Sequence, residues 1–353
     1  MLNFYYIAPM NAFFYHLAKG FKFIPLRRFT TITGQNLILP FYHLVSDENR
    51  IHVKNLYRVK SVKEFVNDLD FFLKHYKPVD FHVLSSAGNV KENSFLLSFD
   101  DGLREFYEVV APVLKQKGIP AICFLNSGFI DNKELFFRYK ASILIENLRT
   151  SNVSSAKEKK LRNWFQFNGL DYSDDFQSLL SVNYRNKGCL DELSVLLEIC
   201  FSDYLQQHKP YLETGQIEEL IAQGFHFGSH SVDHPFYAGI SEEEQIDQTK
   251  RSLDEITSLF KLDYRLFSFP FSDYGVSKRF FDKIFDPANP IADITFGTSG
   301  LKKDFCPRNK QRIPVEVGNY TVQEVIYGEY LYYICKAFFG KNRLIRGDFY
   351  SKS

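Results

Sequence analysis

The chain has 353 residues, of which 45% are hydrophobic and 24% are charged, and its net charge is +1. This composition is typical of a globular protein with a large core, and the balanced charge excludes the broad basic surface that nucleic-acid binding needs. The five cysteines are scattered without a Cys-x-x-Cys spacing, which indicates reduced thiols in a cytosolic protein rather than a disulfide framework.

The two ends of the chain share an aromatic and basic character. Residues 1–46 contain no acid and are rich in Phe and Tyr, and the segment from Tyr327 to Arg346 is similar. No apolar run reaches the ~20 residues of a membrane-spanning helix, and the N-terminus does not resemble a signal peptide. Two interpretations stay open: peripheral contact with an anionic membrane surface, and helices packed on the protein's own surface.

Strands and helices alternate from residue 36 onward. The first strand contains Pro40 near its middle, which weakens it or places it at an edge, and Ser61 and Glu64 form a capping box at the start of a helix. The elements predicted for this part are strands over 36–43, 95–99 and 121–125 and helices over 61–73 and 103–117. Such alternation predicts parallel βα units.

The alternation stops at about residue 132 and resumes after residue 207. The segment 132–207 is helical in pattern and lacks strand signals, so it is predicted to be a helical insertion. The elements predicted after it are helices over 215–223 and 241–260 and from 321, and strands over 225–228, 265–269, 294–296 and 313–317.

About seven strands separated by helices, with polar residues at their carboxyl ends, favour an α/β barrel whose site lies at that end. An open doubly wound sheet would place its site at the same edge and remains an alternative. The sequence has no GxGxxG or Walker-type glycine loop, which counts against nucleotide binding.

Asp100 and Asp101 directly follow the strand predicted at 95–99. Two adjacent carboxylates repel each other and cost solvation free energy when they are buried. They either cap the helix that follows or divide the work at a metal, where one is a ligand and the other is free to take a proton from water.

His230 and His234 are four residues apart and would face the same way if one helical turn separated them. Pro235 disfavours a longer helix. Two imidazoles and one carboxylate form a nitrogen and oxygen ligand set that suits Zn²⁺, with Co²⁺ or Ni²⁺ as alternatives. A pair of capping or surface histidines would give the same pattern.

The chain resembles the polysaccharide deacetylases of carbohydrate esterase family 4. The motifs that carry this resemblance are Ser98–Gly102, Gly228–Pro235 and Phe267–Gly275. The resemblance covers roughly residues 36–318 and implies a distorted (β/α)7 barrel. The helical insertion within this range, 132–207, lies outside the resemblance, as do an N-terminal extension, 1–35, and a C-terminal helix and tail, 319–353.

The resemblance also implies an activity, the removal of N-acetyl groups from amino sugars by metal-activated water. It implies that Asp101, His230 and His234 bind the metal and that Asp100 is the general base. The backbone N–H at Phe271 is the expected oxyanion donor.

Two departures from the family pattern bear on activity. Ser268 stands where the family has an Arg that orients the base, and no histidine follows His234 to act as the catalytic acid. His43, at the end of the first strand, is the candidate acid, and its alternative role is that of a buried structural histidine. Arg312 either replaces the missing arginine or is an ordinary strand-end residue.

The leading hypothesis is a metal-dependent deacetylase acting on an N-acetylated polysaccharide or glycan precursor, in the cytoplasm or peripheral to the membrane. One alternative is a metal amidohydrolase with a small C–N substrate. Another is a catalytically silent, deacetylase-like module that binds a membrane assembly. The position of His43 discriminates these hypotheses, because a place beside the metal residues supports catalysis and a place in the core supports the silent module.

Overall fold

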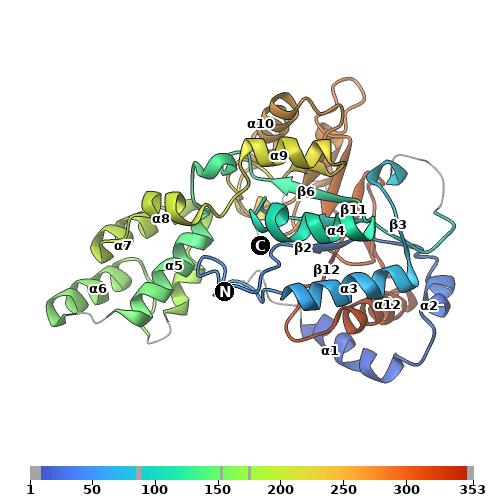
Figure 1. Cartoon of the computed structure of the whole chain (residues 1–353), viewed down its shortest axis with the longest axis horizontal. Coiled ribbons are helices and arrows are strands. Elements are labelled where there is room, and N and C mark those ends of the chain that lie inside the picture. Colours follow the sequence, from blue (N-terminus) through green and yellow to red (C-terminus); the bar gives the residue numbers. More distant parts are fainter. Residues whose placement is uncertain (1–8, 85–89, 152–153, 174–175, 348–353) are drawn as a thin grey trace.

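The computed structural model describes residues 9–84, 90–151, 154–173 and 176–347. Within these residues the centre of the molecule is an eight-stranded parallel sheet with the order β11-β9-β8-β7-β6-β5-β2-β12 (Figure 1). Its strands are β2 (Pro40–Tyr42), β5 (Leu97–Phe99), β6 (Ala121–Leu125), β7 (His226–Ser229), β8 (Leu266–Ser268), β9 (Ile294–Gly297), β11 (Asn309–Gln311) and β12 (Ile313–Pro314).

The sheet curls into a nearly closed barrel, and one extended segment forms its seam. β11 pairs with β9 at one edge, and β12 pairs with β2 at the other edge. Only Arg312 separates β11 from β12, so the two short strands act as a seventh barrel strand with a break in its middle. The predicted (β/α)7 barrel is therefore confirmed, although the part of this strand before Arg312 was not predicted.

Two of the predicted strands are divided in the structure. Residues 36–43 form β1 (Leu37–Ile38) and β2, and residues 95–99 contribute to β4 (Ser94–Phe95) and β5. β1 and β4 pair with each other in a small parallel sheet that also contains β3 (Lys77–Pro78), whereas β2 and β5 belong to the barrel. Pro40 is the first residue of β2, a position where a strand tolerates the missing N–H.

Helices cover the barrel, and three of them begin at capping boxes: the predicted one at Ser61, and those of Ser241 and Thr321 at the starts of the helices predicted at 241–260 and from 321. The helices outside the insertion are α1 (Pro9–Leu17), α2 (Leu26–Thr33), α3 (Val62–His75), α4 (Ala111–Lys117), α9 (Thr214–Ala222), α10 (Glu242–Phe260), α11 (Lys278–Ile284) and α12 (Val322–Phe338). A side-chain cap of this kind satisfies backbone N–H groups that the first turn leaves unpaired.

The helix predicted at 103–117 starts later than expected. It begins with a π-helical turn, η3 (Phe106–Val110), and continues as α4 up to the left-handed Gly118. The start is delayed because Leu212 donates its N–H to the Gly102 carbonyl at 2.9 Å and Arg104 donates to Pro210 at 2.9 Å. These bonds hold Leu103 in an isolated antiparallel β-bridge with Tyr211.

Between β6 and α9 the chain forms a group of helices, which Figure 1 shows at the left of the barrel. They are α5 (Phe137–Thr150), α6 (Ser155–Phe167), α7 (Cys189–Leu197) and α8 (Phe201–His208). Their facing side chains are buried in one cluster that includes Leu144, Leu161, Phe165, Leu190 and Leu193. The helical character predicted for the insertion is confirmed, and its exact boundaries as a domain remain a prediction.

The N-terminal helices pack against α12. Tyr15 donates its hydroxyl to Glu329 at 2.6 Å, and Tyr327 donates to the Ile24 carbonyl at 2.9 Å. Gly328 permits this approach, because a Cβ there would lie 2.4 Å from the Tyr15 ring. Among the described residues, no helix is both long and apolar enough to cross a membrane.

The turn after β8 is held by a buried polar network around Asp273. Its carboxylate accepts hydrogen bonds from Asn309 at 2.9 Å and Gln311 at 2.7 Å. Arg346, near the end of the described chain, pairs with both Asp273 and Asp304. All three charged side chains are nearly inaccessible to solvent, so the arginine is what allows two carboxylates to be buried side by side.

Replacing Arg346 with Met should therefore destabilise the protein, because the substitution leaves Asp273 and Asp304 buried together without a cation. We expect the free energy of unfolding to fall by about 3 kcal/mol, the typical loss when one partner of a buried pair is removed. Urea denaturation measures this change. Arg343→Met, at an exposed position in β13 (Arg343–Leu344), is the matched control. An equal effect of both substitutions would contradict the role of Arg346 in the burial of the two carboxylates.

Candidate active site

The candidate site is built at the carboxyl ends of neighbouring barrel strands. His43 follows β2, Asp100 and Asp101 follow β5, and His230 follows β7. Asp100 donates its N–H to the Tyr42 carbonyl at 2.9 Å, and His230 donates to the Leu125 carbonyl at 2.7 Å. The strand register therefore brings these side chains to one end of the barrel, as expected for an α/β barrel.

Asp101, His230 and His234 converge around a common point. Asp101 Oδ1 lies 3.2 Å from His234 Nε2 and 3.6 Å from His230 Nε2. All three residues are buried, with at most 3% of their surface exposed. Together they form a group whose ligand atoms all lie within 4.8 Å of one another.

Hydrogen bonds fix the orientation of this group. His230 Nδ1 lies 2.8 Å from the Ser268 carbonyl, which assigns the proton to Nδ1 and leaves the Nε2 lone pair free for a ligand. Tyr139, from helix α5, donates its hydroxyl to Asp101 Oδ2 at 2.9 Å. Asp101 Oδ1, in contrast, is buried without a hydrogen-bond partner among the described residues.

A divalent metal ion fits this arrangement. A buried carboxylate oxygen without a hydrogen bond is costly, and here it faces the two imidazole nitrogens. Burial lowers the pKa of His230 to about 4, although the charge of Asp100 opposes that change. The His230 ring is therefore neutral at physiological pH, the state that a metal ligand requires.

The two histidines lie on a tight loop and not on a helical turn, so the predicted helical spacing is wrong. Ser231 and His234 both have positive φ angles, +71° and +62°. Ser231 Oγ accepts the backbone N–H of His234 at 3.0 Å, a local bond that competes with helix formation. The loop brings the two imidazole centres to 4.8 Å.

Asp100 lies beside His230 and is bound by Arg312. The guanidinium donates to Asp100 Oδ1 and Oδ2, at 2.7 Å each, in a two-point ion pair. Burial alone would raise the pKa of Asp100, but the charge of Arg312 outweighs it and holds this pKa below the usual value. Asp100 is therefore an ionised carboxylate, with Oδ2 4.0 Å from His230 Nε2.

Arg312 reaches Asp100 through the space beside Ser268. Its guanidinium donates to Ser268 Oγ at 2.6 Å and to Ser98 Oγ at 3.0 Å. It also lies 4.2 Å from the centre of the Phe41 ring, a favourable cation–π distance. The short side chain at position 268 and the long one at position 312 thus complement each other around Asp100.

His43 forms a second ionisable pair with Glu316, a residue that the sequence analysis missed. His43 Nδ1 lies 2.7 Å from Glu316 Oε2, and Glu316 also accepts the backbone N–H groups of His43 and Leu44. Burial lowers the pKa of His43, but the hydrogen bond and charge of Glu316 outweigh it and raise the pKa to about 9. A signal existed in the sequence, since Glu316 lies near the carboxyl end of the last predicted barrel strand, 313–317.

The helical insertion and the turn after β8 supply an aromatic wall. The ring of Phe136 lies 4.4 Å from that of His234, and the ring of Phe271 lies 4.6 Å from it on another side. Phe271 has a positive φ of +58°, a conformation that a bulky residue rarely adopts. The oxyanion role expected for its backbone N–H remains a prediction.

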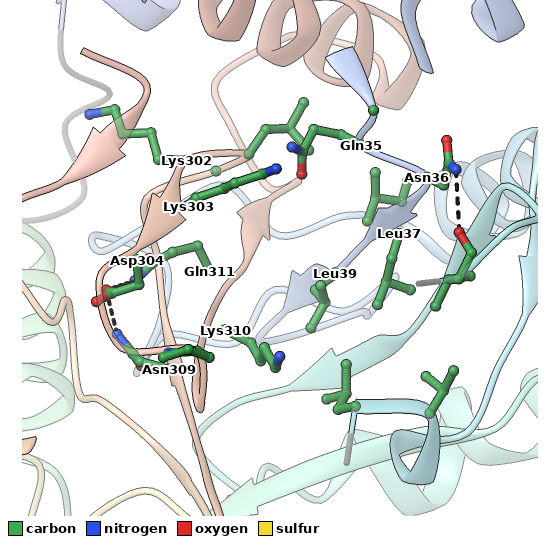
Figure 2. A pocket seen from close by; sticks show the side chains of 18 of the residues that line it. Gln35, Asn36, Leu37, Leu39, Lys302, Lys303, Asp304, Asn309, Lys310 and Gln311 are labelled. Atoms are coloured by element: carbon green, nitrogen blue, oxygen red, sulfur yellow. Dashed lines mark hydrogen bonds between the residues drawn. The ribbon is translucent and has the colours of Figure 1, made fainter. Parts of the chain in front are cut away.

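A cavity of about 900 Å³ lies elsewhere, beside the start of β2 and β11 (Figure 2). Its rim includes Asp304, which accepts hydrogen bonds from Asn309 and Gln311 at 2.9 and 3.0 Å. This cavity shares no residue with the Asp101 and histidine group. We place the active site by its chemistry, at the other end of β2.

Comparison with known proteins identifies the family. The sequence model described as "Polysaccharide deacetylase" matches residues 87–184 and 189–281, more than half of the chain. The chain belongs to the polysaccharide deacetylase family. A search of curated protein sequences gives no significant match.

Solved structures with the same fold include deacetylase PplD of Streptococcus pyogenes, in complex with acetate, and IcaB of Ammonifex degensii. For PplD the TM-score is 0.51 at 14% identity, covering 83% of this chain and 97% of that chain. For IcaB the TM-score is 0.50 at 16% identity, with the same two coverages. At such low identity the likeness supports the barrel fold alone.

The family match divides the site of this polysaccharide deacetylase into two parts. Asp100, Asp101, both site histidines and Phe271 lie within the matched residues, whereas His43, Arg312 and Glu316 lie outside them. The unmatched part comes from two paired strands, β2 and β12, and from the residues next to them. His43 and Arg312, the candidates named for the two departures from the family pattern, therefore both come from this unmatched part.

Replacing Glu316 with Gln should lower the pKa of His43 from about 9, because burial is then opposed only by the smaller effects of the Asp101 and Asp100 charges. The amide preserves an acceptor for the backbone N–H groups. NMR titration of the His43 imidazole measures the shift, and Glu218→Gln, at an exposed position, is the control.

The same pair predicts the pH dependence of stability. A raised folded-state pKa means that protonated His43 stabilises the fold fully below pH 6.5, and that this contribution is lost as the pH rises through about 9. Glu316→Gln should abolish that alkaline loss. An unchanged His43 titration in the variant would disprove the pairing.

Proposed function

We propose that the chain is a divalent-metal-dependent carbohydrate N-deacetylase that hydrolyses the N-acetyl amide of an amino sugar in a polysaccharide or glycan precursor. The observation that carries this proposal is the convergence of Asp101, His230 and His234 beside an ionised Asp100, in a member of the polysaccharide deacetylase family.

Asp101, His230 and His234 would hold the metal through one carboxylate oxygen and two Nε2 atoms. When bound, the ion would supply Lewis acidity that lowers the pKa of water and polarises the acetyl carbonyl. The nitrogen and oxygen donors suit Zn²⁺, and Co²⁺ or Ni²⁺ would also be accepted by such a set. Tyr139 holds the second oxygen of Asp101 and so keeps the first one directed at the histidines.

Asp100 is the proposed general base, which accepts a proton from the attacking water. Arg312 fixes the carboxylate in place and keeps it ionised. Each carboxylate oxygen carries two lone pairs, so the hydrogen bond from Arg312 leaves Oδ2 able to accept a proton on the side that faces His230. The positive charge of Arg312 also makes Asp100 a weaker base, because it lowers the proton affinity of the carboxylate.

His43 is the proposed general acid, which donates a proton to the leaving amine. Its raised pKa keeps it protonated at neutral pH, and a general acid must carry its proton when the amide bond breaks. Glu316 binds Nδ1, and Nε2 is the proposed donor. His43 follows β2, and Asp100 and Asp101 follow β5, the strand paired with β2, which supports a place for His43 at the same end of the barrel.

The pairing of His43 with Glu316 favours a catalytic protein over the silent binding module. Both departures from the family pattern have a chemical counterpart here: Arg312 at the base and His43 with Glu316 at the acid. The proposed oxyanion donor remains the backbone N–H of Phe271, aided by the positive charge at the metal position.

The burial of the site favours one alternative, a hydrolase for a small C–N substrate. The metal residues and Asp100 have at most 3% of their surface exposed, and Phe136 of the insertion packs directly on His234. A site covered in this way would admit a short acetylated sugar more readily than the middle of a polymer. Acetate release from substrates of increasing length separates the two functions.

We also propose that the protein lies in the cytoplasm and contacts the membrane surface peripherally. The terminal helices expose apolar side chains, those of Phe13, Leu17, Phe23, Ile32, Phe338 and Phe339. The exposed basic residues Lys19, Arg27 and Arg28 lie in the same helical region. Apolar and basic groups together suit an anionic lipid surface, and sedimentation with anionic vesicles tests this proposal against neutral ones.

The central test is acetate release from a panel of N-acetylated glycans, with and without a chelator. We expect activity that the chelator abolishes and that added Zn²⁺, Co²⁺ or Ni²⁺ restores. Activity that persists at full rate in the chelated protein would contradict metal dependence.

His43→Ala should reduce turnover by about 10²–10⁴-fold, the usual cost of losing a general acid, while metal content stays unchanged. Both quantities can be measured on the same preparation. His16→Ala, an exposed position in α1, serves as the control. Turnover equal to that of the wild type would remove His43 from the mechanism.

Asp101→Ala should lose the metal, because two imidazoles alone hold a divalent ion weakly. Elemental analysis of the purified variant measures this loss, with circular dichroism to establish that it is folded. A variant that still carries one ion at the site with His230 and His234 would contradict the ligand assignment.

A further inference from the structure

A second cluster of metal-binding side chains lies at the opposite end of β7. It consists of Asp80, His82 and His226, whose ligand atoms all lie within 4.8 Å of one another. His226 is the first residue of β7, and His230 follows its last residue. At about 3.3 Å per residue along a strand, the two clusters are roughly 13 Å apart, so one ion cannot serve both.

One carboxylate bridges the two imidazoles of this cluster. Asp80 contacts His82 Nδ1 through one oxygen and His226 Nε2 through the other. The ligands of a tetrahedral zinc ion lie roughly 3.3 Å apart, since each is about 2.0–2.1 Å from the metal. Small side-chain rotations would therefore place an ion between the three groups.

Hydrogen bonds hold the backbone around the cluster in place. Asp80 Oδ1 accepts the backbone N–H of His82 at 3.0 Å, and Val79 donates its N–H to the Phe95 carbonyl at 3.0 Å. The short helix η2 (Phe81–Leu84) begins here. Two ligands thus lie on a turn that is tied to β4, and the third lies on a barrel strand.

Aromatic rings form one side of the cluster. The Phe81 ring stacks on that of His82 at 4.1 Å and meets that of His226 edge-on at 4.8 Å. Tyr264 lies 4.7 Å from Phe81. These contacts limit the rotation of both imidazoles, and His82, whose side chain is 69% exposed, leaves the other side open for a water ligand.

We propose that Asp80, His82 and His226 form a second divalent-metal site, of the zinc class, that joins the segment between β3 and β4 to the barrel. Binding requires a lone pair at His82 Nδ1 and at His226 Nε2, so a proton on either atom moves to the other ring nitrogen or is released to solvent. The bound ion would stabilise the fold and would take no part in the proposed hydrolysis.

The experiment is Co²⁺ loading of the full chain, desalting and elemental analysis. We expect two equivalents per wild-type chain, one in Asp101→Asn, one in His82→Ala and none in the variant with both substitutions. His82 is largely exposed, so its replacement should not impair folding, and His16→Ala is the matched control that should keep two equivalents.

The outcomes separate this site from the active site. A wild-type protein that binds one equivalent, lost in Asp101→Asn and kept in His82→Ala, would overturn the second site and leave the proposed function intact. A His82→Ala variant that keeps two equivalents would also overturn it. One equivalent that is lost in His82→Ala and kept in Asp101→Asn would support the second site and contradict the metal dependence of the proposed function.

Discussion

The buried ion pair between Asp100 and Arg312 is the interaction on which both the barrel and the site depend. Arg312 lies at the break between β11 and β12, where its backbone N–H bonds the Gly297 carbonyl at 3.0 Å and the next N–H bonds the Leu39 carbonyl at 2.8 Å. The same residue sends a fully buried guanidinium into the barrel. A charge in that position is tolerable only with a partner, so closure of the barrel and ionisation of Asp100 depend on each other.

The pair also explains how two adjacent carboxylates can be buried. Asp101 has a φ of +70°, which turns its side chain away from that of Asp100. One carboxylate then faces Arg312 and the other faces two imidazoles and the Tyr139 hydroxyl. The strained backbone at Asp101 is thus the local cost of separating two like charges, and strain of this kind is concentrated at functional sites.

Sequence reasoning identified what is local along the chain. The strand ends that carry Asp100 and His230, the capping boxes and the helical character of the insertion follow from patterns of a few residues. The loop at His230–His234 was mistaken for a helical turn, because its shape is set by the Ser231 hydroxyl and by two positive φ angles, which the spacing of the histidines does not reveal.

The long-range partners were harder to predict. Arg312 is 212 positions from Asp100, and the sequence offered no reason to choose between a base-orienting arginine and an ordinary strand end. Glu316 was missed for the same reason, since its pairing with His43 across 273 positions depends on which two strands meet at the seam. Only the closure of the barrel brings the last strand beside the first one.

The helical insertion makes the site a joint product of two packing units. The hydrophobic cluster of the insertion also includes two barrel-loop residues. They are Leu44, directly after His43, and Leu103, directly after the Asp100–Gly102 turn. The same helices supply the Tyr139 hydroxyl to Asp101 and the Phe136 ring to His234. A displacement of α5 would therefore disturb Asp101 and His234 together, whereas Arg312 and Asp100 are held by the barrel alone. The barrel thus positions the proposed base, and the insertion positions one of the proposed metal ligands and covers another.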